Sequence, residues 1–174
     1  MTNAVKVFKG VFLVLATIIF LYGSTTCEAY DDCRVYDAGV DRLVNSLEKS
    51  GMSVTFKEKG ERDSLAEVQT TPYEYTVNFD KKIKLHFDVD NSGYVYYISI
   101  FSESANLTNY KNVAIQVLKI LGMNDQQATY LFNKRNSKNG TAKGAYIDVA
   151  GRLFMVSEGP VESGGSILFI AAAK

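Results

Sequence analysis

The stretch that decides the fold is residues 75–102, YTVNFDKKIKLHFDVDNSGYVYYISIFS. Apolar and polar residues alternate in its first two segments, and the turn sequence DNSG precedes its third. Alternation with a period of two is typical of a strand with one buried face. We therefore expect three antiparallel strands, over Tyr75–Phe79, Ile83–Val89 and Tyr94–Ser102.

Helical spacing of apolar residues flanks this meander. It predicts a helix over Arg34–Ser50, stopped by Gly51, with a short strand after Met52. On the other side it predicts helices over Leu107–Leu121 and Asn124–Arg135, with Asn124 as a cap. Alternation then resumes in three further strands, over 145–149, 153–157 and 166–173.

The two halves of the chain match in the order of their elements. Leu47-x-x-x-Gly51-Met52 corresponds to Leu118-x-x-x-Gly122-Met123, and the strand and turn patterns follow at similar offsets. We therefore expect an α+β fold built from two similar modules of helix followed by antiparallel β-meander, at 30–104 and 105–174. The match favours an internal duplication, although any two helix-plus-meander units share a hydrophobic pattern.

Composition excludes several functional classes. The 174 residues carry 19 basic and 19 acidic side chains, whereas a nucleic-acid-binding protein usually has a basic surplus. A single histidine excludes sites that need several imidazoles, and no phosphate loop or known hydrolase motif occurs. Asp88–Gly93 imitates the start of a calcium loop, but Ser99 stands where the final Glu should be. We expect no metal and no cofactor.

The N-terminus has the layout of a secretory signal peptide. Lys6 and Lys9 precede the apolar run Val11–Tyr22, and small residues follow. We expect residues 1–29 to be this signal and the mature protein to be secreted, periplasmic or exposed on the cell envelope. The alternative is an uncleaved N-terminal anchor, for which twelve apolar residues are short.

The two cysteines, Cys27 and Cys33, leave three alternatives. Cleavage before Cys27 would let them close a small disulfide loop outside the cell. Cleavage after Ala29 would leave Cys33 as a lone thiol. Lipidation of Cys27 is the third reading, although the preceding residues lack the Leu of a bacterial lipobox.

A binding surface is predicted from the expected register of the hairpin. If Asn91–Gly93 forms the loop, Asp88 faces Tyr96 and His86 faces Ile98. One face then combines aromatic, aliphatic and charged side chains, a composition that suits recognition. The binding residues that we select are Tyr94, Tyr96, His86 and Lys84. This wet face also includes Lys82, Ile98 and Ile100, while Val95, Tyr97, Ser99 and Phe101 would line the core.

These observations favour a small extracytoplasmic binding protein, inhibitory or accessory to the envelope, whose partner is a protein or an envelope component. The alternative is a secreted hydrolase with paired carboxylates between the modules, which only their arrangement in space can test. A homodimer through the second sheet is a third hypothesis, based on apolar residues expected on its outer face: Tyr146, Phe154, Val156, Leu168 and Ile170.

Overall fold

The computed structural model describes residues 33–62, 69–103, 107–134, 144–160 and 165–173. The predicted signal peptide and Cys27 lie outside these ranges. The strands are β1 (Tyr36–Gly39), β2 (Val54–Lys59), β3 (Thr71–Val77), β4 (Ile83–Val89), β5 (Tyr94–Ser102), β6 (Ala145–Val149), β7 (Arg152–Pro160) and β8 (Ser166–Ala173). The helices are α2 (Val40–Lys49), α3 (Leu107–Ile120) and α4 (Asp125–Lys134).

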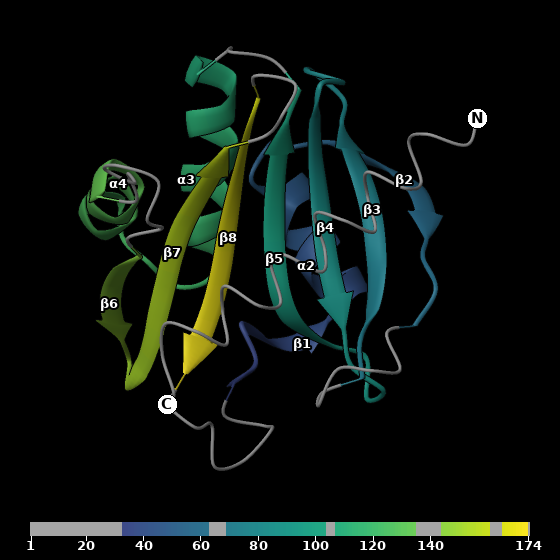
Figure 1. Ribbon diagram of the computed structural model, residues 1–174, viewed down its shortest axis with the longest axis horizontal. Helices are drawn as coiled ribbons and strands as arrows, with labels where there is room; N and C mark the ends of the chain where they lie inside the picture. Colours follow the sequence, from purple (N-terminus) through teal and green to yellow (C-terminus); the bar gives the residue numbers. More distant parts are fainter. Residues whose placement is uncertain (1–32, 63–68, 104–106, 135–143, 161–164, 174) are drawn as a thin grey trace.

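The eight strands form one antiparallel sheet in the order β2-β3-β4-β5-β8-β7-β6, with β1 also paired to β5 (Figure 1). The α+β class is therefore confirmed. The strands of the two sequence halves join edge to edge through β5 and β8, in the register Ile98↔Ile170 and Ile100↔Leu168. In chain order, β2 to β5 run from one edge of the sheet to its centre, and β6 to β8 run from the other edge to the centre. The internal duplication stays a prediction.

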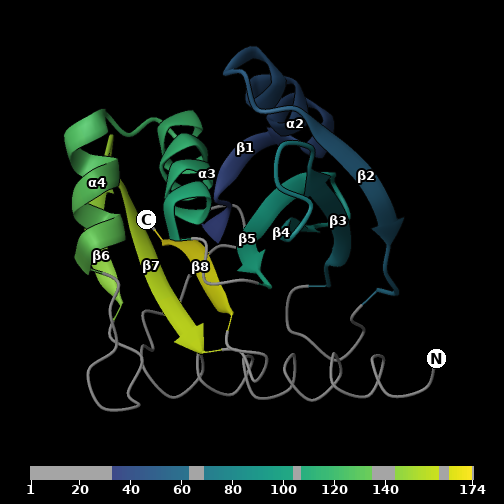
Figure 2. The ribbon, with the colours of Figure 1, turned by 90° about the horizontal axis from the view of Figure 1, so that it is seen from above.

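The helices cover one face of this sheet (Figure 2). The core lies between the two layers, because the apolar face of each strand packs against the apolar stripe of a helix. Its fully buried members include Leu43 and Leu47 of α2, Val113 and Val117 of α3, Leu131 of α4, and Leu85, Phe87, Ile98, Ile100, Leu168 and Ile170 of the sheet. The opposite face, which we call the helix-free face, carries none of the described helices.

The predicted helix ends are confirmed. The Met52 N–H donates to the Leu47 carbonyl at 2.9 Å, and the Met123 N–H donates to the Leu118 carbonyl at 3.3 Å. Each is a Schellman-type cap around a glycine with positive φ, at Gly51 and Gly122. Asn124 caps α4 as expected: the Gln127 N–H donates to Asn124 Oδ1, and the Asn124 N–H donates to Gln127 Oε1, both at 2.9 Å.

The prediction of a helix over the whole of Arg34–Ser50 is wrong at its start. Residues 36–39 form β1, and the helix begins at Val40. The Val35 N–H donates to the Val95 carbonyl at 3.0 Å, and Tyr36 pairs with Val95. Pairing with β5 satisfies the backbone of this segment, so tertiary contact overrides the local helical pattern.

Candidate functional site

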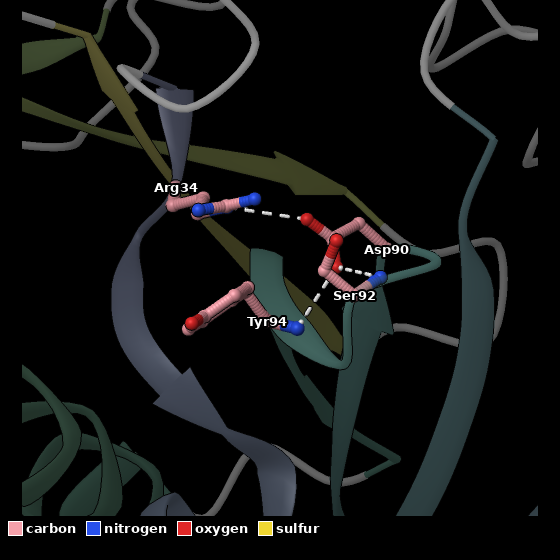
Figure 3. A network of polar contacts seen from close by, with 4 residues as sticks. All are labelled: Arg34, Asp90, Ser92 and Tyr94. Carbon is pink, nitrogen blue, oxygen red and sulfur yellow. Dashed lines mark hydrogen bonds and ion pairs between the residues drawn. The ribbon is translucent and has the colours of Figure 1, made fainter.

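The turn between β4 and β5 is closed by Asp90 (Figure 3). Its Oδ1 accepts hydrogen bonds from the N–H groups of Ser92 at 2.8 Å and Tyr94 at 2.9 Å. Arg34 Nε donates to Asp90 Oδ2 at 3.2 Å, and the guanidinium carbon lies 4.0 Å from the centre of the Tyr94 ring. Tyr94, selected as a binding residue, therefore contacts the arginine that ties β1 to this turn.

The loop at Asn91–Gly93 is confirmed, but the register beyond it is not the expected one. Val89 pairs with Val95 and the next pair is Asp88↔Tyr97, so Tyr96 is a bulge residue without a partner on β4. The prediction that Asp88 faces Tyr96 is wrong. One extra residue in a strand reverses which face every later side chain occupies.

This bulge corrects the predicted faces of β5. Ile98 and Ile100, expected on the wet face, are fully buried in the core, and Tyr96 is also buried. The residues expected in the core, Tyr97, Ser99 and Phe101, are half-buried and pair with Asp88, His86 and Lys84 on the helix-free face. Of the predicted core residues of β5, Val95 alone is buried.

A charged cluster, here called the acidic flank, lies on the helix-free face of β2, β3 and β4 and at the end of β5. It consists of Glu58, Glu74, Lys84, His86, Asp88 and Glu103. Lys84 Nζ lies 3.6 Å from Glu74 Oε1 and 3.3 Å from Glu103 Oε1, and His86 Nε2 lies 3.4 Å from Glu74 Oε2. The register places Glu58 and Glu74 opposite each other, and Glu74 opposite His86. The predicted binding residues Lys84 and His86 are thus brought together.

Burial, followed by the charge of Lys84, lowers the pKa of His86 to about 4, whereas Glu58 acts in the opposite direction. The short distance to Glu74 would by itself favour a charged imidazole, but the loss of hydration outweighs that attraction. His86 is therefore neutral at pH 7, and the acidic flank carries a net negative charge. Burial, followed by the charge of Asp88, raises the pKa of Tyr97.

Beside this flank lies a group of apolar side chains from β5, β8 and β7, which we call the apolar strip. Its members are Tyr97, Phe101, Met155, Ile167 and Phe169, and all are half-buried. Phe101 pairs with Ile167, and Met155 and Gly159 on β7 pair with Ala171 and Ile167 on β8. A Cβ at Gly159 would lie 3.4 Å from Ile167 Cγ2 and 3.6 Å from Phe169 Cε2, so both side chains lean over β7.

Sequence reasoning missed the strip, although β8 contained a signal for it. Residues 166–170 read SILFI, with apolar residues at successive positions. A strand that is apolar on both faces indicates that both faces are covered by other groups. Leu168 and Ile170 point into the core, which leaves Ile167 and Phe169 on the helix-free face.

The residues behind the homodimer hypothesis are placed differently from the prediction. Phe154, Val156, Leu168 and Ile170 are buried in the core, and Tyr146 alone of the five is exposed. They are not an outer face, because the helices cover this side of β7 and β8. Dimerisation itself stays an untested prediction.

The described residues also form an open cleft, of about 310 Å³, between β1, the end of α3 and the start of β7. It is lined by Val35, Tyr36, Asp37, Ala38, Ile120, Leu121, Gly122 and Arg152. Its single carboxylate, Asp37, pairs with Arg152 at 2.5 Å. This cleft does not bring together the two carboxylates that the hydrolase hypothesis requires.

A second arrangement relevant to hydrolysis lies across the sheet, where Glu74, His86 and Ser99 are successive cross-strand neighbours. The order is that of an acid, a base and a nucleophile. However, β4 and β5 are interior strands here, and their N–H groups serve the sheet ladder rather than an oxyanion. Within the described ranges, no three His, Cys, Asp or Glu side chains gather as a metal site would require.

Cys33 is disulfide-bonded. The chain has one other cysteine, Cys27, which lies outside the described residues, so the pairing of the two stays a prediction. In the part of the chain that the structure covers, no helix is long and apolar enough to span a membrane.

Of the four selected binding residues, Lys84 and His86 share the helix-free face, Tyr94 lies at the turn and Tyr96 is buried. No protein-family model, no curated protein and no solved structure matches this chain.

Proposed function

We propose that this protein is a small extracytoplasmic binding protein that holds a partner protein on the helix-free face of its sheet. The apolar strip is the observation that carries the proposal. Aromatic and aliphatic side chains from three adjacent strands lie on the same face of the sheet, next to charged groups on β3 and β4. An apolar centre with a polar rim is typical of protein interfaces, and contiguous apolar patches tend to mark interaction sites.

The extracytoplasmic location rests on the N-terminal sequence. Two lysines, an apolar run of twelve residues and a group of small residues follow one another in the order of a signal peptide. A disulfide at Cys33 supports this location, because disulfides persist in oxidising compartments.

The proposal assigns no cofactor to this face. Phe101 and Phe169 would act as the anchors, since large aromatic side chains supply most of the binding energy at interfaces. The acidic flank would set the orientation and the choice of partner, because complementary charge contributes more to specificity than to affinity.

The test compares a strip variant with a matched exterior variant. Wild type, Phe169→Thr and Phe79→Thr are produced in the natural host and cross-linked chemically in intact cells and medium. Thr keeps strand propensity, and Phe79 is 56% exposed in the turn after β3. We expect Phe169→Thr to lose a cross-linked species that wild type and Phe79→Thr both form, with a loss of at least about tenfold.

Circular dichroism of both variants checks that the fold is retained. A cross-linking pattern that is unaffected by Phe169→Thr and by Phe101→Thr, in folded protein, would refute a partner on this face. Intact-mass measurement of the recovered wild type locates its N-terminus, and a start at Met1 in the membrane fraction would refute cleavage.

A further inference from the structure

The sheet ends in two edge strands that differ in their protection against further pairing. β2 and β6 lie at opposite edges (Figure 1), and in the described part of the chain each pairs with one strand only. The outer side of an edge strand presents a row of unpaired N–H and C=O groups, to which another strand can add. Edge lysines and β-bulges oppose such pairing, because they charge or distort the edge.

β2 carries both kinds of protection, and β6 carries neither. The ladder between β2 and β3 is interrupted by a bulge, and β2 includes Lys57 and Lys59. In contrast, residues 145–149 of β6 read AYIDV and pair with β7 in an unbroken register. The charged side chain of β6, Asp148, accepts a hydrogen bond from the Gly151 N–H at 3.1 Å and so serves its own hairpin turn. We call the outer side of β6 the unprotected edge.

The hairpin turn determines which backbone groups of β6 face outward. Ala150 and Gly151 have φ values of 56° and 81°, which is the signature of a two-residue type I′ loop. The two residues that flank such a loop exchange hydrogen bonds, and hydrogen-bonded pairs then alternate along the antiparallel ladder. The N–H and C=O groups of Tyr146 and Asp148 therefore point away from β7, toward the edge.

The unprotected edge is complementary to itself. When two β6 strands pair antiparallel about Ile147, Tyr146 of each copy lies opposite Asp148 of the other, and these are the positions whose backbone groups face outward. On the helix side, Ile147 meets Ile147 of the second copy and Ala145 meets Val149. This register sets apolar residues opposite apolar residues and no like charges opposite each other.

We propose that two copies of this chain pair through β6 about a two-fold axis, so that their sheets join into one. The occupant of the unprotected edge is a second copy, because an isologous contact satisfies the outward groups of both strands and closes. The helix-free faces of both copies then lie on the same side of the joined sheet, since residues opposite each other in a ladder share a face. The contact lies at the sheet edge, so it does not depend on the partner proposed for the helix-free face.

The expected dimer is weak. One short strand and its neighbouring side chains provide an interface at or below the low end of specific interfaces, where dissociation constants of about a micromolar or weaker are expected. Sedimentation equilibrium of the protein purified from its natural host, at about 1 to 200 μM, should therefore show monomer and dimer in exchange.

Two edge variants and one matched control test the location of the contact. Tyr146→Pro removes one outward N–H, and Tyr146→Lys places a charge at the edge. Each should raise the dissociation constant at least about tenfold. The control is Phe56→Lys on β2, since Phe56 and Tyr146 are both 51% exposed. This control should leave the monomer–dimer equilibrium unchanged.

A cysteine variant tests the register. Residues opposite each other without mutual hydrogen bonds have Cα atoms about 4.5 Å apart, which is within the range of a disulfide. Ile147→Cys should therefore form a covalent dimer on air oxidation, visible on non-reducing electrophoresis. Val149→Cys should not, because its position lies opposite Ala145 of the second copy.

A monomer at every concentration, a dimer weakened as much by Phe56→Lys as by the edge variants, or no covalent dimer from Ile147→Cys would overturn the proposal. Circular dichroism confirms that each variant is folded before it is scored. The cellular cross-linking of Phe169→Thr has a separate readout, so the edge contact can fail while the partner face stands, and the partner face can fail while the edge contact stands.

Discussion

Acidification should destabilise the folded protein through His86. The imidazole lies on β4 with Glu74 of β3 and Glu58 of β2 on one side and Lys84 two residues away along its own strand. Its pKa is lowered from 6.5 to about 4 in the folded state, first by burial and then by Lys84. The unfolded chain therefore binds a proton more readily than the folded one.

The size of the effect follows from linkage between protonation and folding. At about pH 5 the unfolded chain has bound almost one proton at this histidine and the folded protein roughly a tenth of one. A full proton of difference corresponds to about 1.4 kcal/mol per pH unit, and the difference is nearly zero above the unfolded pKa. Integrated from about pH 7.5 to about pH 5, the loss is therefore about 2 kcal/mol. The contribution of neutral His86 is complete above pH 6.5 and is lost as the pH falls toward 4.

The assay is urea unfolding followed by far-ultraviolet circular dichroism, since the chain contains no Trp. Wild type and His86→Gln are compared at both pH values, so that the titration of nearby carboxylates largely cancels. We expect wild type to lose about 2 kcal/mol more of its free energy of unfolding than His86→Gln. Equal losses in the two proteins would show that His86 is not held neutral by its surroundings.

Three further predictions test the sheet register and the hairpin turn. Ile100→Ala should cost about 2 to 5 kcal/mol of unfolding free energy and Phe101→Ala less than half as much, since only Ile100 is fully buried. Urea titrations measure both losses, and the reverse order would contradict the bulge. Asp90→Ala should cost about 1 to 3 kcal/mol of unfolding free energy, because two backbone N–H groups and Arg34 lose their acceptor, and Asp90→Asn should cost less. Thermal unfolding measures both variants, and equal losses would argue against the side-chain cap. Gly93→Ala should cost about 1 to 2 kcal/mol of unfolding free energy, since φ at this position is +86°. The added Cβ would meet no atom within 4 Å, so the cost would come from backbone strain alone, and an unchanged melting temperature would refute that strain.

Most of the secondary structure could be predicted from the sequence, with the exception of β1, which depends on pairing with β5. Strict alternation in β4 and the glycine stops after α2 and α3 are local signals, and each is reproduced in the structure. The loop at Asn91–Gly93 was equally readable, because a glycine with positive φ is what a short hairpin loop requires.

The faces of β5 were not readable, for a physical reason. Residues 94–101 are YVYYISIF, so either set of alternate residues is apolar enough to be the buried one. When both faces are acceptable, hydrophobic pattern does not fix the register, and a single bulge decides it. The candidate site depended on this register, which is why Tyr96, the bulge residue, is buried. Tyr94 precedes the bulge and lies at the turn.

The position of β8 in the sheet also governs how the chain can fold. It is the last strand in chain order, yet it lies between β5 and β7 and makes the join between the two halves. Until β8 is in place, β5 keeps an open edge and β6 and β7 have no sheet to join. Such pairing between distant segments is a high-contact-order step, which slows folding. Slow closure would keep the chain unfolded for longer after synthesis, which would suit the export that we propose, since an export pore that passes unfolded polypeptide favours a protein whose central strand arrives last.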